Sequence, residues 1–572
     1  MKPARSLLFL VALLVAGLWL GPTHTLADEL PEDTNKIESL TPEQARKLAA
    51  EFPGVEVEFE NGGGTVWGRG LPLQGLKSLD PDTAKALAEF KGKWLSLSGL
   101  TTLDADTAKS LAEFKGDLRL NGLTTLDAAA AKAIAEFKGD LRLNGLTTLD
   151  AAAANALAEF KGWQLVLSGL TTLDAVTAKV LAECKGNSLV LNGLTTLDTE
   201  TAKALAECEG NLWLHGLTTL DTDTAKALAE FKGQQLSLGG LTTLDTAKAK
   251  ALAECKGKLW LNGLTTLDAD IAKALARYKG WELSLSALTT LDADTVKAFA
   301  GFKGGRLSLI GLTTLDADTA KALAGSKVWS GRLPKLTTLD ADTAKALAEF
   351  KGDNLSLDGL TTLNADTAKS LAEFKGQALG LNRLKALDAE TAKVLAESKA
   401  WNGMLPRLTT LDAPTAKALA EFKGRWLQLG GLASLDTDAA KALAEFKGEL
   451  TLPDTVLKQL FADNPLTPET ALAWAVVSNG NLSHVTALDS PDSVAIAQAL
   501  ATRKGVLALP NLEKISPKTL SALIEKEDVE IPLIETLELI PEPDGSANDD
   551  FVIPEWLEER QKQQRFKGPA AE

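Results

Sequence analysis

The sequence is poor in the side chains on which most catalytic and metal sites depend. Its 572 residues include three cysteines, two methionines and a single tyrosine, and only His215 and His484 among the histidines lie beyond the first 27 residues. No glycine-rich phosphate loop, zinc-ligand spacing or nucleophile elbow is present. We therefore expect a protein that is not an enzyme, with no catalytic residue, no cofactor and no metal ion. Such a restricted composition is typical of a chain built by copying one short unit.

Basic side chains are also in deficit. The chain has 60 lysine and arginine residues against 76 aspartate and glutamate residues, a net charge of −16. Nucleic acid and anionic membrane surfaces are poor partners for such a protein. The charge allows a cationic or calcium-rich surface as a partner, but it does not require one.

Only one long apolar run occurs, from Leu7 to Leu20, after Lys2 and Arg5 and before a small-residue stretch that ends at Ala27. This pattern predicts a secretory signal peptide over residues 1–27. The alternative is an uncleaved anchor, but the run is shorter than the roughly 20 residues that span a bilayer. We expect an extracytoplasmic protein, either periplasmic, in the cell envelope or secreted, with no membrane insertion after cleavage.

What the chain has in abundance is one repeated unit. An aspartate, or once an asparagine, returns at intervals of 23 or 24 residues, a period in the range of leucine-rich repeats. These positions are Asp80, Asp104, Asp127, Asp150, Asp174, Asp198, Asp221, Asp245, Asp268, Asp292, Asp316, Asp340, Asn364, Asp388, Asp412 and Asp436.

Each unit predicts a strand, a turn and a helix. Leu95 and Leu97 alternate with polar residues, as in a short strand with one buried face. Asp104 suits the N-cap of a helix, and Gly116 suits a left-handed residue after its end. One unit buries too few apolar side chains to offset its ordering entropy, so we expect the units to stack. Ala108, Leu111, Ala112 and Phe114 form the predicted buried stripe of the helix.

The stretch Leu118-Arg119-Leu120-Asn121-Gly122-Leu123-Thr124-Thr125-Leu126 resembles bacterial leucine-rich-repeat proteins, and the resemblance covers about residues 71–452. It implies an α/β solenoid, with a curved parallel sheet on the concave face and short helices outside. Family members typically bind proteins or envelope components. The chain departs from the family at the asparagine ladder, because leucine stands there, as at Leu100. Asparagine occurs two positions earlier instead, at Asn121, Asn144, Asn192 and Asn262.

Five regions follow from this pattern. The ends are degenerate, as the terminal units of a solenoid are. We predict a signal peptide at 1–27, an N-terminal cap with a degenerate repeat at 28–70, the solenoid at 71–453, divergent C-terminal repeats at 454–540 and a flexible charged tail at 541–572.

Two residue sets have a structural and a functional interpretation. The aspartate row could bind cations, but N-capping accounts for each member. Cys184, Cys208 and Cys255 replace the phenylalanine of the repeat, so they are predicted to be small core residues. A disulfide between Cys184 and Cys208, which lie in adjacent units, is geometrically conceivable.

Tryptophans gather near the predicted strands. Trp213 and Trp260 stand between two strand leucines, so alternation should point them away from the core, about 10 Å apart across two units. Exposed indoles suit a sugar or a peptide. The alternative is that tryptophans fill grooves between units or lie singly on the surface. The tryptophans near the start of a predicted strand are Trp94, Trp163, Trp213, Trp260, Trp281, Trp329, Trp401 and Trp426.

Arg119 and Arg142 occupy the equivalent outward position in consecutive units. They are candidates for a local basic patch, or alternatively for solvated strand residues. Pro334 and Pro406 each remove a strand hydrogen-bond donor, so pairing should be disturbed in their units.

The function expected from the sequence is that of a non-enzymatic exported scaffold. It would bind a protein or a cell-envelope glycan, or act in adhesion, through its concave strand face. The candidate ligand-binding residues are Trp213, Trp260, Arg119 and Arg142. The alternative is a structural spacer or self-assembling cell-envelope component. A solenoid that regulates a hydrolase in another chain is a third possibility, which no sequence feature supports.

Overall fold

A computed structural model describes residues 33–52, 55–61, 64–463, 466–542, 555–559 and 561. The predicted signal peptide at 1–27 lies outside the described residues, as does most of the predicted tail at 541–572. In the described part of the chain, no helix combines the length and the apolar character that crossing a membrane requires. The chain divides into two compact units. The first comprises Met1–Thr171 and Glu183–Val190, and the second comprises Thr172–Ala182 and Leu191–Glu572.

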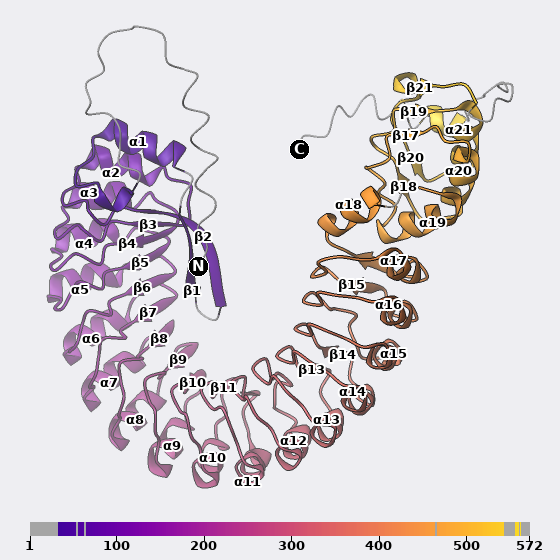
Figure 1. Cartoon of the computed structure of the whole chain (residues 1–572). Helices are drawn as coiled ribbons and strands as arrows, with labels where there is room; N and C mark the ends of the chain where they lie inside the picture. Colours follow the sequence, from indigo (N-terminus) through magenta and orange to yellow (C-terminus); the bar gives the residue numbers. More distant parts are fainter. Residues whose placement is uncertain are drawn as a thin grey trace, which may run out of the picture. The chain divides into compact units, whose positions relative to one another are not determined.

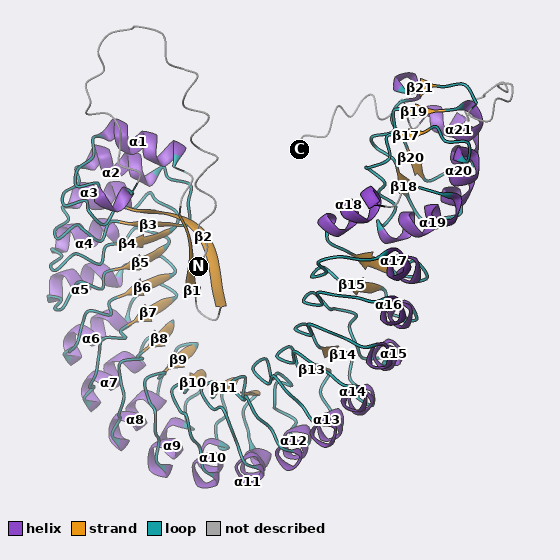
Figure 2. Cartoon of the chain, in the orientation of Figure 1, coloured by secondary structure: helices purple, strands orange, loops and turns teal. Residues whose placement is uncertain are grey.

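The first unit begins with a helical cap and a hairpin, and short coils follow. Strands β1 and β2 are antiparallel, and β2 continues into a parallel sheet through its pairing with β3. From β3 to β7 each strand pairs with the next one in chain order. Figure 2 shows the helices stacked along one side of these strands. The elements are η1 Thr34–Lys36, α1 Pro42–Glu51, β1 Val55–Asn61, β2 Gly64–Pro72, α2 Pro81–Ala88, β3 Trp94–Ser96, α3 Ala105–Leu111, β4 Asp117–Arg119, α4 Ala128–Ile134, β5 Asp140–Arg142, α5 Ala151–Ala158, β6 Gln164–Val166 and β7 Ser188–Val190.

The second unit continues with the same strand–turn–helix coil. Strands β8 to β12 are parallel and lie in chain order, and β13–β14 and β15–β16 form separate parallel pairs. In Figure 1 the strands of this unit line the inner side of its arc and the helices lie outside. Its repeating elements are α6 Ala175–Ala182, α7 Thr199–Ala206, β8 Asn211–Trp213, α8 Thr222–Ala229, β9 Gln235–Ser237, α9 Thr246–Leu252, β10 Lys258–Trp260, α10 Ala269–Leu275, β11 Glu282–Ser284, α11 Ala293–Ala298, η2 Phe299–Gly301, β12 Arg306–Ser308, α12 Ala317–Ala324, α13 Ala341–Ala348, β13 Asn354–Ser356, α14 Ala365–Ala372, β14 Ala378–Gly380, α15 Ala389–Glu397, α16 Ala413–Ala420, β15 Trp426–Gln428, α17 Thr437–Leu443 and β16 Glu449–Thr451.

These coils confirm the predicted α/β solenoid of leucine-rich-repeat-like units. Leu95, Leu97 and Leu111 are fully or almost fully buried, as are their counterparts in later coils, because each coil covers the apolar face of its neighbour. The predicted core role of the cysteines also holds for Cys208 and Cys255, which are buried.

The aspartate row caps the helices, as predicted. Asp104 accepts a hydrogen bond from the Thr107 backbone N–H at 2.9 Å and another from the Thr107 hydroxyl at 2.8 Å. The first of these bonds is the main reason why the pKa of Asp104 lies below its ordinary value. The Thr107 hydroxyl also lies 3.2 Å from the Leu79 carbonyl oxygen of the preceding coil. The threonine therefore couples the cap to coil stacking, a role that spacing alone did not reveal.

Gly116 does not end its helix in the left-handed conformation, so that prediction was wrong. Helix α3 ends earlier, with Ala112 as a right-handed C-cap, and Gly116 is not among the positive-φ glycines. A β-carbon on Gly116 would instead collide with the carbonyl oxygen of Lys93 in the preceding coil. The glycine is required because two backbones approach closely there.

Pairing is disturbed where the two prolines stand, as predicted. Trp329 and Trp401 form only isolated parallel β-bridges, to Leu307 and Leu379, where other coils have a short strand. Both indoles are buried against the phenylalanine that ends the same unit, Phe350 or Phe422, with ring centroids 4.8 and 4.7 Å apart.

The divergent C-terminal region keeps parallel pairing, with β17, β19 and β21 in one sheet and β18 and β20 in another. The last described residues of this region pack against the divergent repeats. Glu542 is buried and accepts hydrogen bonds from the Ser516 hydroxyl and the Lys518 backbone N–H, both at 2.9 Å. Leu557, in the predicted tail, is also buried. The elements are α18 Asp454–Asp463, α19 Pro468–Val477, β17 Ala487–Leu488, α20 Ser493–Ala501, β18 Leu507–Ala508, β19 Lys514–Ile515, α21 Pro517–Ile524, β20 Val529–Glu530, η3 Ile534–Thr536 and β21 Glu538–Leu539.

Candidate functional site

The third residue of each short strand points away from the leucine core, and these positions are less accessible than the sequence suggested. In strands β3 to β12, small residues at this position are almost fully buried between their neighbours, whereas Ser356 of β13 is half-buried and Thr451 of β16 is exposed. Longer side chains are half-buried, so they supply most of the accessible surface of this face. The buried group includes Ser96, Val166, Val190, Ser237, Ser284 and Ser308, and the half-buried group is Arg119, Arg142, Trp213 and Trp260.

Trp213 and Trp260 form the aromatic part of the candidate site. They are the third residues of β8 and β10, and both pair in register with Ser237 of β9. Their ring centroids are 6.2 Å apart and the rings are inclined at 57°. The separation is shorter than the 10 Å expected from strand spacing, because the indoles lean toward each other across the small serine. Ser237 is only 1% exposed as a result.

His215 joins this pair, although its position, which holds asparagine or serine in many other repeats, suggested only ordinary variation. Its Nε2 atom lies 2.7 Å from the Ser237 hydroxyl oxygen, in a hydrogen bond whose donor depends on the histidine tautomer. Its ring centroid is 5.3 Å from that of Trp213. Burial lowers the pKa of His215 below its ordinary value of 6.5, which favours the neutral ring at pH 7. Trp213, His215, Ser237 and Trp260 are called the indole cluster below.

The histidine fits because of the residue beside it in the next coil. Gly239 occupies the equivalent position, two residues after β9, and a β-carbon there would lie 3.1 Å from the His215 ring. Many other coils carry asparagine or serine at this position. The contact between His215 and Ser237 therefore depends on residues of two coils: the histidine in one, and the serine and glycine in the next. Spacing within one repeat could not predict it.

The asparagines form an inter-coil ladder, displaced from the usual position. The side-chain oxygen of Asn144 accepts from the Ser168 backbone N–H at 3.0 Å, and that of Asn121 accepts from Asn144 at 3.2 Å. In the second unit, Asn192 accepts from the His215 N–H at 3.0 Å. The ladder consequently fixes the backbone of the histidine from the coil before it.

The serine–histidine pair is not arranged for nucleophilic catalysis. A reactive serine must be reachable by substrate, with free N–H donors beside it to stabilise an oxyanion. Ser237 is almost completely covered, and the N–H of the following Leu238 donates to the Trp260 carbonyl oxygen at 2.8 Å. The geometry therefore favours a binding role for this cluster over catalysis.

Arg119 and Arg142 are neither fully solvated nor a simple basic patch. Both bind the carboxylate of Asp117, with nitrogen–oxygen distances of 3.0 and 3.1 Å. Asp117 is buried, and the guanidinium of Arg119 also lies 4.6 Å from the centroid of the Trp94 ring. Burial, with the nearby charge of Asp117, raises the pKa of Asp140, the residue paired with Asp117 on the next strand. The arginines thus share a buried acidic environment.

The remaining tryptophans divide between the two interpretations. Trp94, Trp329 and Trp401 are buried, as the groove-filling alternative expected. The indoles of Trp163, Trp281 and Trp426 are more than half exposed and lie at or just before the start of a strand.

Sulfur and metal chemistry contribute nothing further to the site. Cys184, Cys208 and Cys255, all within the described residues, form no disulfide, so the conceivable Cys184–Cys208 bond is not made. Across the residues that the structure describes, no group of three or more histidine, cysteine and acidic side chains could hold a metal ion.

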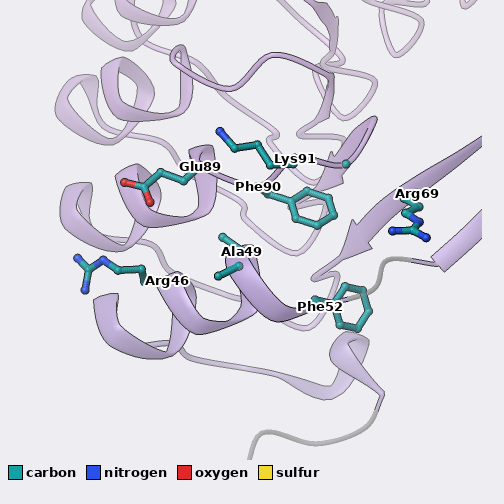
Figure 3. A pocket seen from close by; sticks show the side chains of 9 residues that line it. Arg46, Ala49, Phe52, Arg69, Glu89, Phe90 and Lys91 are labelled. Atoms are coloured by element: carbon teal, nitrogen blue, oxygen red, sulfur yellow. The ribbon is translucent and has the colours of Figure 1, made fainter. Parts of the chain in front are cut away.

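Two hollows lie beside the stacked helices. One, of about 390 Å³, is lined by residues of α1, β2 and the connection from α2 to β3. Figure 3 shows the Phe90 ring near its middle, with Arg46 and Arg69 toward opposite sides. A second, of about 900 Å³, is lined by the corresponding alanine, glutamate, phenylalanine, lysine and glycine positions of later coils. Because equivalent positions of the repeat line both hollows, we interpret the hollows as a consequence of helix stacking.

No protein-family model and no curated protein sequence matches the chain. The solved structures that match the chain include two at low sequence identity. The mouse RP105/MD-1 complex contains a chain that is 16% identical, with a TM-score of 0.38; the match covers 71% of this chain and 76% of that one. A chain of the TLR13–ssRNA13 complex is 19% identical, with a TM-score of 0.33; the match covers 80% of this chain and 64% of that one.

Proposed function

We propose that this chain is a non-catalytic, exported recognition scaffold that binds a protein or glycan ligand through its strand face. The observation that carries this proposal is the indole cluster: two half-buried indoles, 6.2 Å apart, flank a histidine–serine hydrogen bond. Large aromatic side chains with partial exposure offer much contact area at low entropic cost, as binding sites require. The export part of the proposal rests on the apolar run before Ala27.

Variation between coils supports the strand face over the helix face. A solenoid of similar coils can select a ligand only through positions that differ from coil to coil. The helix face repeats the same aspartate cap and the same inter-coil ion pairs, such as Lys161–Glu136 at 3.0 Å and Lys232–Glu207. The third strand residues instead change from serine to arginine, valine and tryptophan.

Arg119 and Arg142 belong to the proposal as a secondary contact surface. Because both guanidinium groups are held by the single carboxylate of Asp117, their remaining N–H groups are oriented donors. We propose that they contribute hydrogen bonds to a ligand on the first unit.

The alternative function, a structural spacer or self-assembling envelope component, is favoured by one observation. The repeated lysine–glutamate pairs link successive helices, for example Lys185 with Glu159, and make that face uniform. A spacer needs uniform stacking and no specific ligand, so it predicts that replacement of the indole cluster changes no interaction.

The test compares two double variants of the full chain. Trp213→Ala with Trp260→Ala removes the half-buried indoles, and Trp163→Ala with Trp426→Ala removes two exposed ones elsewhere. Binding to isolated cell envelopes of the source organism should fall at least tenfold only in the first variant, since truncation of an anchor costs about 2 kcal/mol or more. Thermal unfolding should change little, because both rings remain partly exposed.

Two outcomes would count against recognition by the indole cluster. If the first variant loses thermal stability and still binds, its indoles serve packing between coils. If wild-type protein binds envelopes and neither variant differs from it, the spacer or assembly function is favoured.

A further inference from the structure

We propose that the indole cluster binds a neutral, linear glycan built of pyranose rings. This inference rests on the proposed recognition function and names the class of ligand for that same site. It commits to a carbohydrate rather than a protein, on the grounds of polarity, charge and the state of the strand backbones around Trp213 and Trp260.

The polar groups beside the indoles are uncharged and can both donate and accept hydrogen bonds. Asn262 accepts from the Ser284 hydroxyl at 2.8 Å and from the Ser286 backbone N–H at 3.1 Å. These bonds use its carbonyl oxygen and leave the amide N–H groups as donors. With His215, whose ring is held by the covered Ser237 hydroxyl, the surface offers amide and imidazole groups within nearby coils. Sugar hydroxyls, which are both donors and acceptors, match such a set.

The indoles supply the complementary apolar surface. One face of a pyranose ring carries C–H bonds with partial positive charge, and the face of an aromatic ring is electron-rich. The 57° inclination between the Trp213 and Trp260 rings gives two such faces in one site. The outcome is a surface where stacking and hydrogen bonding occur side by side.

The indole N–H groups provide an independent indication of a ligand. Nε1 of Trp213 and Nε1 of Trp260 are buried and lack a hydrogen-bond acceptor in the described structure. The same holds for three other indoles, Trp94, Trp329 and Trp401, but those rings are enclosed in the core. Trp213 and Trp260 are half-buried rather than enclosed, so we propose that their rings shift on binding and bring both donors to ligand oxygens.

Charge favours a neutral ligand. The charged side chains nearest along these strands are Lys258 and Glu282, at the first positions of β10 and β11. The Lys258 ammonium group lies 4.9 Å from the centroid of the Trp281 ring, away from the third strand positions. No carboxylate or guanidinium occurs among the four members of the cluster, so an acidic polymer would gain no ion pair there.

A peptide fits the site less well. Backbone groups beside the indoles are already paired between strands: the Leu214 N–H donates to the Ser237 carbonyl oxygen and the Leu238 N–H to that of Trp260. A peptide therefore cannot add to these strands as a further strand. A folded protein partner would need roughly 800 Å² of contact surface, yet the neighbouring third positions, Ser284 and Ser308, are small and buried.

The experiment measures binding of the full chain to hexasaccharides by titration calorimetry. The neutral probes are cellohexaose, chitohexaose and maltohexaose, and the acidic probe is hexagalacturonic acid. We expect saturable binding of at least one neutral probe and at least tenfold weaker binding of the acidic one. Trp213→Ala with Trp260→Ala should weaken the neutral interaction at least tenfold, and the matched pair Trp163→Ala with Trp426→Ala should stay within twofold of wild type.

A conservative variant guards against loss of fold. Trp213→Phe with Trp260→Phe keeps the stacking faces but removes the indole N–H groups, so it should retain binding intermediate between wild type and the alanine variant. Absence of binding to every neutral probe would overturn the glycan assignment. If envelope binding still depends on the two indoles, the recognition function survives that result. If neither kind of binding depends on them, both proposals fail.

Discussion

The arginine pair of the first unit and the indole cluster of the second occupy the same strand position and differ in how completely their polar groups are satisfied. Arg119 and Arg142 close around the buried carboxylate of Asp117. Trp213 and Trp260 close around Ser237, but their N–H groups find no acceptor in the described structure. The same backbone thus supports one cluster that is electrostatically complete and another that retains unused hydrogen-bonding capacity.

The difference shows how a repeat protein can acquire a specific surface without changing its fold. Strand register brings third residues of neighbouring coils within reach, whatever those residues are. Side-chain chemistry then determines whether neighbours satisfy one another or remain available to a ligand. Three predictions test this comparison, from the largest expected effect to the smallest.

Replacement of Asp117 should have the largest effect. Asp117→Ala leaves two half-buried guanidinium groups without their carboxylate, so we expect a loss of about 2–3 kcal/mol in the free energy of unfolding. This lies below the value for fully buried pairs, because both arginines retain some contact with water. Denaturant unfolding measures it. The control is Glu449→Ala, at the same first strand position as Asp117, which breaks the exposed Arg425–Glu449 pair and should cost less than about 1 kcal/mol. Equal losses in the two variants would contradict the contrast between a buried and an exposed pair.

Crowding of the histidine should have an intermediate effect. In Gly239→Ala the new methyl group meets the His215 ring, whereas Gly430, at the corresponding position of a later coil, has open space around it. Gly430→Ala should be neutral or slightly stabilising, and Gly239→Ala should be about 1 kcal/mol less stable than that control. Denaturant unfolding of both variants measures this difference in the free energy of unfolding. If they behave alike, the His215–Ser237 contact does not depend on the glycine.

The pH dependence of His215 should give the smallest effect. Burial lowers its pKa in the folded chain below 6.5, so the unfolded chain takes up a proton first as the pH falls. Stability from the neutral ring is therefore fully present above pH 6.5 and is lost as the pH falls through the lower folded pKa.

His484, whose pKa is lowered in the same direction, contributes with the same sign. His215→Asn restores the residue found in other coils and isolates the first contribution. The wild type should lose slightly more stability between pH 7 and pH 5 than this variant does. A pH profile that is identical in the two proteins would show that the histidine makes no such contribution.

Much of the fold could be predicted because the residues that specify the strand and the helix start lie within each repeat. The alternation of Leu95 and Leu97 predicted a strand, and Asp104 predicted the start of a helix; both hold. Gly116 was misassigned because its role depends on the carbonyl oxygen of another coil. The β1–β2 hairpin was likewise absent from the prediction, since its sequence lies outside the repeat.

The candidate site was predicted only in part. Trp213 and Trp260 were identified by their place between leucines, but His215 was overlooked because no signal within its own repeat distinguishes it. The expected basic patch was incomplete for the same reason: Asp117 stands two residues before Arg119, yet its reach to Arg142 depends on strand register.

The sequence by itself determined the period, the coil and the face to which each strand residue points, because these follow from spacing along one chain segment. Only the tertiary structure decided which side chains meet across coils: the indoles over Ser237, the two arginines on Asp117 and the asparagine bonds to the next backbone. The physical reason is that a coil cannot bury its apolar face alone, so its environment is completed by neighbours about 24 residues away in sequence and one strand spacing away in space.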